Sequence, residues 1–146
     1  MLSPQLFRAI RRFWLPTAMT FFLNGLACGG WAAQVPSATR RLQMDEGTLG
    51  LILLGMGIGA VAAMAFSGRM IARYGAGLLI RLSLVVFLAS YIVLSTAPTL
   101  ALFAAAVLLF GAAGGLMDVA MNAYASDVEA HMDWRVMASV HRMGGV

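Results

Sequence analysis

The chain has 146 residues, of which 61% are hydrophobic and 11% are charged. Soluble domains contain about 45–50% apolar and about 25% charged residues, so the composition excludes a soluble domain and predicts an all-α integral membrane protein. The net charge is +4, but the ten basic residues are arginines scattered between apolar runs. No basic face carries interleaved aromatic side chains, so we expect no nucleic-acid partner.

The titratable and nucleophilic residues form no pattern typical of an enzyme. Cys28 is the single cysteine, which excludes an intrachain disulfide and a cysteine-rich metal site. His131 and His141 have no ligand partners at metal-binding spacing. No nucleophile with a base and no paired carboxylates are found. We therefore expect no enzymatic activity, no cofactor and no metal.

The first apolar run covers residues 13–35, about 23 residues, which exceeds the roughly 20 needed to cross a bilayer. Arg8, Arg11 and Arg12 precede it and could suggest a secretory signal, but the run is too long and three further apolar runs follow. We interpret it as a retained spanning helix that ends at Pro36.

A weakly polar face runs along this helix. It is formed by Thr17, Thr20, Asn24, Cys28 and Trp31, which lie within about 40° of one line. Asn24 is near the middle of the span, where an amide needs a partner. Asn24 has two interpretations: an interhelical hydrogen bond that holds helices together, and contact with a solute. Gly25 and Gly29 form a small-xxx-small pair that predicts close helix packing.

The second span is predicted at residues 48–67. Asp45 is expected to cap this helix, and Glu46 suits the positive end of the helix dipole. Four glycines lie within or next to the apolar run, at Gly50, Gly55, Gly57 and Gly59. No strand precedes them, so they indicate a helix-packing face rather than a nucleotide-binding loop.

A hydrophilic connection is predicted at residues 68–77, and a third span at 78–97. A very short turn at Pro98 leads to a fourth span at 99–122. A charged stretch follows, and a fifth span begins at about 135–146. We expect these spans to form a single membrane domain, residues 1–146, that is part of a longer protein.

The fourth span ends with polar residues that hydrocarbon disfavours. Gly111, Gly115, Asp118 and Asn122 are spaced at i, i+4, i+7 and i+11, so they share one helix stripe. Exposing an acid to acyl chains costs a few kcal/mol, which predicts that the stripe faces protein or a watery cavity. In the alternative interpretation, Asp118 lies near the inner helix end and meets headgroups and water.

The arginines predict the orientation in the membrane. A cytoplasmic N-terminus places eight arginines inside and only Arg40 and Arg41 outside, as the positive-inside rule requires. We therefore expect a multi-pass protein of the cell (inner) membrane.

Four spans, a GxxxxRxG connection and a charged inner loop before a fifth span resemble the first half of a major facilitator superfamily transporter. The family's signature loop has the form Gly-x-Leu-x-Asp-Arg-x-Gly-Arg-Arg/Lys. Gly68, Arg73 and Gly75 match it, whereas Ala72 replaces the acid. Met70 is a near match, and Ala76 and Gly77 replace the last two basic positions. In the family this loop is thought to join the inner ends of helices through charge contacts. Ala72 cannot make such a contact, because it lacks the carboxylate.

Three further stretches, residues 31–36, 118–129 and 137–145, are similar to the sugar permeases of the fucose-permease type. The resemblance implies a secondary transporter of a small organic solute, sugar-like or drug-like, with protons as a candidate coupling ion. It also implies a missing C-terminal half. The candidate path and coupling residues are Asn24, Trp31, Asp118 and Asn122. Asp118 is the only acid in any predicted span, so it is the candidate for proton coupling.

Two alternatives keep the chain whole, as a small oligomeric four-helix membrane protein. A dimeric exporter of the small multidrug kind depends on an acid in the first span, and this sequence has none there. A non-transporting scaffold would use the small-residue faces to bind other helices.

We predict that the reading frame continues past the codon for Val146 and adds roughly eight spans. Sequencing of the coding DNA and the mass of the protein in its own membranes check this. A stop codon after Val146 with a stable 15.5 kDa product would support a small oligomeric protein instead.

Overall fold

The computed structural model describes the backbone of residues 4–143 and the side chains of Met19 and residues 22–127. It contains four helices: α1 (Pro4–Arg41), α2 (Glu46–Tyr74), α3 (Ala76–Thr96) and α4 (Leu100–Met143). No strand occurs in the described backbone. The predicted all-α fold is therefore confirmed.

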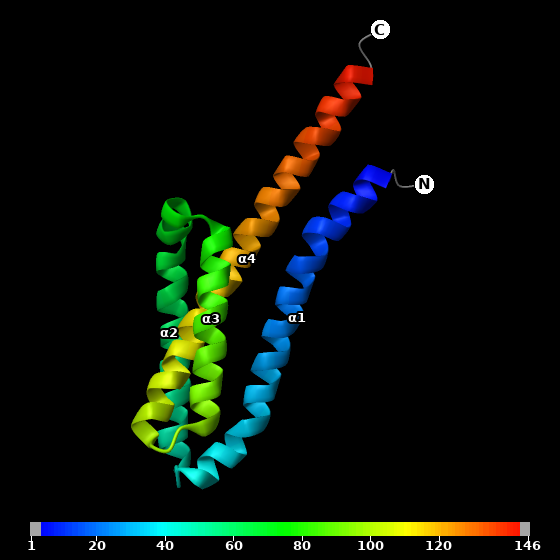
Figure 1. Cartoon of the computed structure of the whole chain (residues 1–146). Coiled ribbons are helices and arrows are strands. Elements are labelled where there is room, and N and C mark those ends of the chain that lie inside the picture. Colours follow the sequence, from blue (N-terminus) through cyan, green and yellow to red (C-terminus); the bar gives the residue numbers. More distant parts are fainter. Residues whose placement is uncertain (1–3, 144–146) are drawn as a thin grey trace.

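The helices alternate in direction, so α1 and α3 run one way and α2 and α4 run the other (Figure 1). The connections at 42–45 and 97–99 share one end, which we call the outer end, and the α2–α3 connection lies at the opposite, inner end. α2, α3 and the stretch Leu100–Asp127 are each long and apolar enough to span a membrane. The chain is therefore a multi-pass membrane protein.

The helices extend beyond the spans that the sequence predicts. α1 begins at Pro4 and continues through Pro36 to Arg41, although Pro36 was expected to mark the exit. Proline removes one backbone hydrogen bond, but the turn that follows is retained because Ala38 packs into the core. The hydrophilic connection predicted at 68–77 is also almost entirely helical, with Gly75 as its single non-helical residue.

α4 crosses the predicted boundary between the fourth and fifth spans without a break. The polar link and separate fifth helix predicted there are therefore not found in the described backbone. Residues 123–134 contain neither glycine nor proline, and charged residues are good enough helix formers for a helix to continue where the apolar span ends. The side chains of the predicted fifth span, residues 135–146, lie outside the described residues.

α2 and α4 pack so closely that their backbones meet at glycines. A Cβ atom added to Gly115 would lie 2.6 Å from the carbonyl oxygen of Ala60, and one on Gly59 would lie 2.9 Å from that of Leu108. A Cβ atom on Gly111 would overlap the carbonyl oxygen of Met56. Helices in lipid gain little from hydrophobic contact, so such close packing is a main source of their association.

Other predicted packing glycines are open. Added Cβ atoms on Gly50, Gly55 and Gly57 would meet nothing within 4 Å, so Gly59 alone of the four predicted in α2 makes a close contact in the described structure. Gly25 and Gly29 of α1 are equally open. Their small size leaves room on faces that no described helix covers.

The core lies where α3 and α4 meet. The Phe87 ring stacks on the Phe110 ring with centroids 4.2 Å apart, a favourable separation for aromatic pairs. Phe103, Met117 and Met121 of α4 are also buried there. This apolar contact positions the inner half of α4 relative to α3.

The start of α2 is capped as the sequence predicts. The Asp45 side chain accepts a hydrogen bond of 2.6 Å from the backbone N–H of Thr48. Hydrogen bonds from the side chain and the backbone of Thr48 lower the pKa of Asp45 below its ordinary value. Glu46 occupies the first turn, where the helix dipole favours an anion.

We predict that Gly115→Ala destabilises the bundle, because the new methyl group meets backbone atoms of α2 that cannot turn aside. Overpacking of this kind costs about 1–3 kcal/mol. The measurement is the midpoint of thermal unfolding in detergent, followed by size-exclusion chromatography of heated samples.

Gly57→Ala is the matched control, since it adds the same methyl group to an open helical position. Replacing an unhindered helical glycine by alanine gains about 0.5–1 kcal/mol, so its midpoint should stay or rise. Equal midpoints for the two variants would contradict the close α2–α4 contact.

Candidate functional site

Asp118 and Asn122 lie one turn apart on the inner half of α4. The Asn122 side-chain amide donates a 2.9 Å hydrogen bond to the backbone oxygen of Asp118. Asp118 is half-buried and Asn122 is exposed. Within the described part of the chain, no side chain donates a hydrogen bond to the Asp118 carboxylate. The carboxylate is therefore available to water, a proton or a further partner.

The stripe that carries these residues faces α2 in its glycine half, because Gly111 and Gly115 touch the α2 backbone. Asp118 follows Gly115 by one turn on the same stripe and so lies on the α2 side of α4. Met117, rotated by about 100° from Asp118, points into the core and is fully buried. The prediction that the stripe faces protein holds for its two glycines.

Trp31 is buried at the outer half of α1, with 8% of its surface exposed. Its ring centroid lies 5.9 Å from that of Phe110 on α4. Tyr91 of α3 approaches the same phenylalanine ring, at 6.2 Å. Trp31 therefore joins α1 to the aromatic core, and its side chain faces α4.

Asn24 is half-buried and lies on the same face of α1 as Trp31. It accepts a hydrogen bond from the Cys28 thiol, with sulfur and oxygen 3.8 Å apart. Asn24 lies seven residues, about 10 Å along the helix, from Trp31, and Asp118 lies eight residues, about 12 Å, from Phe110. Asn24 and Asp118 are therefore at similar membrane depth. The side chains of Thr17 and Thr20, predicted for the same face, lie outside the described residues.

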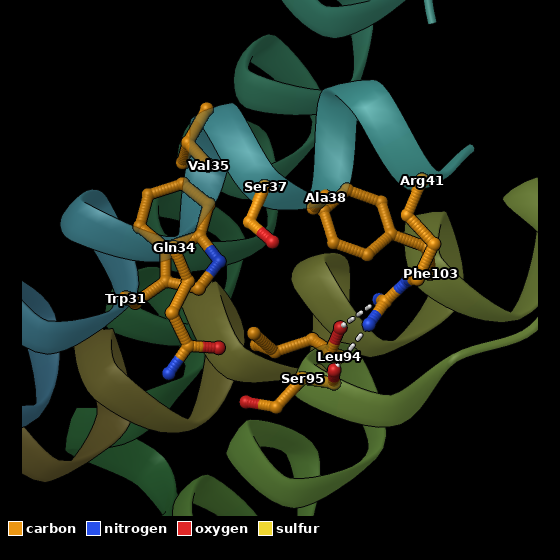
Figure 2. Close-up of a pocket in the computed structure, with 9 residues that line it drawn as sticks. All are labelled: Trp31, Gln34, Val35, Ser37, Ala38, Arg41, Leu94, Ser95 and Phe103. Carbon is orange, nitrogen blue, oxygen red and sulfur yellow. Dashed lines mark hydrogen bonds between the residues drawn. The ribbon is translucent and has the colours of Figure 1, made fainter. Parts of the chain in front are cut away.

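A small cavity lies at the outer end between α1, α3 and α4 (Figure 2). Its volume is about 30 Å³. That is enough for a water molecule or two, whereas pockets for organic ligands occupy about 300–1,000 Å³. Its lining residues are Trp31, Gln34, Val35, Ser37, Ala38, Arg41, Leu94, Ser95 and Phe103. As the described helices form it, the cavity is too small for an organic solute.

Arg41 borders this cavity and contacts the end of α3. Its guanidinium donates to the backbone oxygen of Ser95 at 2.6 Å and to that of Leu94 at 3.3 Å (Figure 2). The sequence placed Arg41 outside the membrane but assigned it no contact. The sequence does carry one signal for this contact. Ala97–Pro98 after α3 provides no glycine to cap the helix, so its last carbonyl groups need donors from another segment.

The signature-loop residues lie at the inner end of α2. Gly75 has a φ of 80°, which side-chain-bearing residues rarely adopt, and its N–H donates a 2.8 Å hydrogen bond to the backbone oxygen of Ile71. Gly68 lies in open space within α2. The Arg73 guanidinium lies 5.4 Å from the centroid of the Tyr74 ring, a cation–π distance. Ala72 replaces the acid of the signature loop, and the Arg73 guanidinium contacts the Tyr74 ring instead of a carboxylate.

No group of three or more metal-ligating side chains occurs among the residues that the structure describes. The side chains of His131 and His141 lie outside that part of the chain.

Comparison with known proteins identifies relatives across nearly the whole chain. The model of the family described as Major Facilitator Superfamily matches residues 6–144. The chain is 40% identical over 133 residues to the uncharacterised transporter y4wD of Sinorhizobium fredii, covering 91% of the chain and 35% of the relative. It is 38% identical over 130 residues to an uncharacterised MFS-type transporter of Yersinia pestis, covering 89% and 34%.

The membrane protein MosC of Rhizobium meliloti is 33% identical over 124 residues, covering 85% of the chain and 30% of MosC. The chain thus spans about a third of the length of these relatives. No solved structure matches it.

We predict that Gly75→Ala destabilises the α2–α3 connection, because alanine is strained at the φ of 80° found there. Backbone strain of this kind costs about 1–3 kcal/mol. The thermal unfolding midpoint in detergent measures it. Gly68→Ala, seven residues earlier in open helical surroundings, is the control and should lower the midpoint little or not at all. An undiminished midpoint for Gly75→Ala would show that the connection tolerates a side chain.

Proposed function

Because the chain belongs to the major facilitator superfamily, we propose that it is the N-terminal part of a secondary transporter that moves a small organic solute by alternating access. The match over residues 6–144 and two relatives named as transporters support this. In this fold, two six-helix halves enclose a midplane site. The chain would supply part of the first half, and the rest of the protein would complete the path. The small four-helix exporter and the scaffold are not favoured.

The main support for this proposal is the half-buried carboxylate of Asp118, which lies inside an apolar span. It has no hydrogen-bonded partner among the described side chains. Ionisable residues at membrane depth usually face a bundle interior or a cavity and take part in ion or proton transfer. We therefore assign Asp118 the coupling role, with protons as the coupling ion. The neighbouring amide of Asn122 would help to hold water or solute.

The α1 side of the path would be formed by Asn24 and Trp31. Trp31 faces α4 through its contact with Phe110, and Asn24 continues that face towards the inner end. Its depth is similar to that of Asp118. The two helices would thus contribute an amide, an indole and a carboxylate at neighbouring levels of the membrane.

We further propose that the solute is uncharged and sugar-like, as in the fucose-permease type of transporter. Support comes from the three sequence stretches that resemble that branch and from the assigned polar groups. An amide can both donate and accept hydrogen bonds to hydroxyl groups.

The proposed orientation places the N-terminus in the cytoplasm and the protein in the inner membrane. Arg69, Arg73 and Arg81 lie towards the inner end of α2 and α3, whereas Arg40 and Arg41 lie at the outer end. An excess of arginine on the cytoplasmic side agrees with the positive-inside rule.

We predict that Asp118→Asn in the full-length protein abolishes solute uptake driven by a pH gradient, because an amide cannot carry the coupled proton. Exchange of solute across the membrane without a gradient should persist, since it needs no net proton movement. The measurement uses proteoliposomes, a panel of neutral monosaccharides and an entrapped pH dye.

Glu46→Gln is the control, because it removes an exposed acid at the outer start of α2 and should leave uptake unchanged. If Asp118→Asn retains full pH-driven uptake, the coupling role of Asp118 is wrong. If no gradient drives uptake of any sugar in the wild type, the sugar-like assignment is wrong.

A further inference from the structure

α1 is attached to the rest of the described bundle through its outer part. Trp31 and Ala38 are its buried side chains in the described range. Towards the inner end, Phe22 is 70% exposed and Leu26 is 61% exposed. Figure 1 shows α1 diverging from α3 in that direction, whereas α4 leans the same way as α1. The direction of the inner half therefore depends on how firmly the outer end is held.

The C-terminus of α3 needs hydrogen-bond donors from elsewhere. The last carbonyl groups of a helix have no partner within it, and the proline that follows, Pro98, has no N–H to offer. The last four carbonyls of α3 belong to residues 93–96. The Thr96 hydroxyl reaches Val93 O at 3.5 Å, whereas the carbonyls of Leu94 and Ser95 receive no hydrogen bond from α3 in the described structure.

Arg41 supplies the missing donors from α1. Its guanidinium binds two of these terminal carbonyls, at 2.6 Å to Ser95 and 3.3 Å to Leu94. The guanidinium is a rigid fork with several donors, and its positive charge lies at the negative end of the α3 dipole. One side chain thus joins the end of α1 to the end of α3.

A second contact joins the same two helices about two turns further in. The Gln34 side-chain amide donates a 2.8 Å hydrogen bond to the Tyr91 hydroxyl. Gly30 makes room for that hydroxyl, because a Cβ atom there would lie 3.0 Å from it. Two separated hydrogen-bonded contacts resist tilting of α1 on α3, which one contact would permit.

We propose that Arg41 is a positioning residue, which fixes the outer end of α1 on α3 and so sets the direction in which Asn24 and Trp31 face α4. Its importance for solute passage rests on the proposed function. The attachment itself is a property of the structure and can be measured without any solute.

The experiment measures the distance between the inner halves of α1 and α3 in the full-length protein in lipid nanodiscs. Nitroxide labels are placed at Phe22→Cys and Leu78→Cys, two exposed positions, with Cys28→Ser and every other cysteine removed. We expect Arg41→Gln to broaden the distance distribution from double electron–electron resonance, because α1 can then tilt. Arg41→Lys, which keeps the charge but lacks the fork, should recover part of the narrow distribution.

Arg40→Gln is the matched control, since it removes the same charge from the adjacent position. Arg40 is exposed and its side chain donates no hydrogen bond to a described residue, so the distance distribution of Arg40→Gln should equal that of the parent. If Arg41→Gln fails to fold, Arg41→Lys replaces it and should still give a broader distribution than the parent. Equal widths for the Arg41→Gln and Arg40→Gln proteins, or for Arg41→Lys and the parent where it is used, would overturn the proposal, whatever the transport assays show.

Discussion

The fold depends on the contact between the backbones of α2 and α4. Side chains are absent at Gly59, Gly111 and Gly115, so carbonyl oxygens of one helix approach the Cα atoms of the other. In lipid this close approach replaces the hydrophobic drive that packs helices in water. Once α4 is held against α2, its other side presents Phe110 to α3 and α1, and the aromatic core follows. The position of Asp118, one turn beyond Gly115, is fixed by the same contact.

Much of this architecture could be predicted from local sequence. Long apolar runs define the helices, Asp45 marks the start of α2, and the stripe through Gly111 and Gly115 identifies the face of α4 that meets protein. The helix ends were predicted less well. Hydropathy reports where the hydrocarbon ends, whereas a helix continues until glycine, proline or a lost hydrogen bond stops it. α2 therefore reaches to Gly75, and α4 continues through its charged stretch.

The contacts between distant segments could not be predicted from one sequence. Gln34 and Tyr91 are separated by two helix connections, and nothing in either local pattern indicates the other. The open glycines of α1 and α2 show the converse case, because a small-residue pattern does not reveal whether its partner lies in the described helices. Asn24 and Asp118 were identified as residue types that lipid disfavours. Their similar depth emerged only from the Trp31–Phe110 contact, which sets the level of α1 against α4.

The α2–α4 contact also has a consequence for how the protein is made. The residues that meet Gly59 belong to α4, which the ribosome produces only after all of α3. α2 must therefore enter the membrane and wait there with its glycine surface in contact with lipid or with the insertion machinery. The α2–α3 connection has a single non-helical residue, Gly75, so the two helices can enter the bilayer as one hairpin. Assembly of this bundle can thus be completed only when α4 leaves the insertion site and docks on its partner.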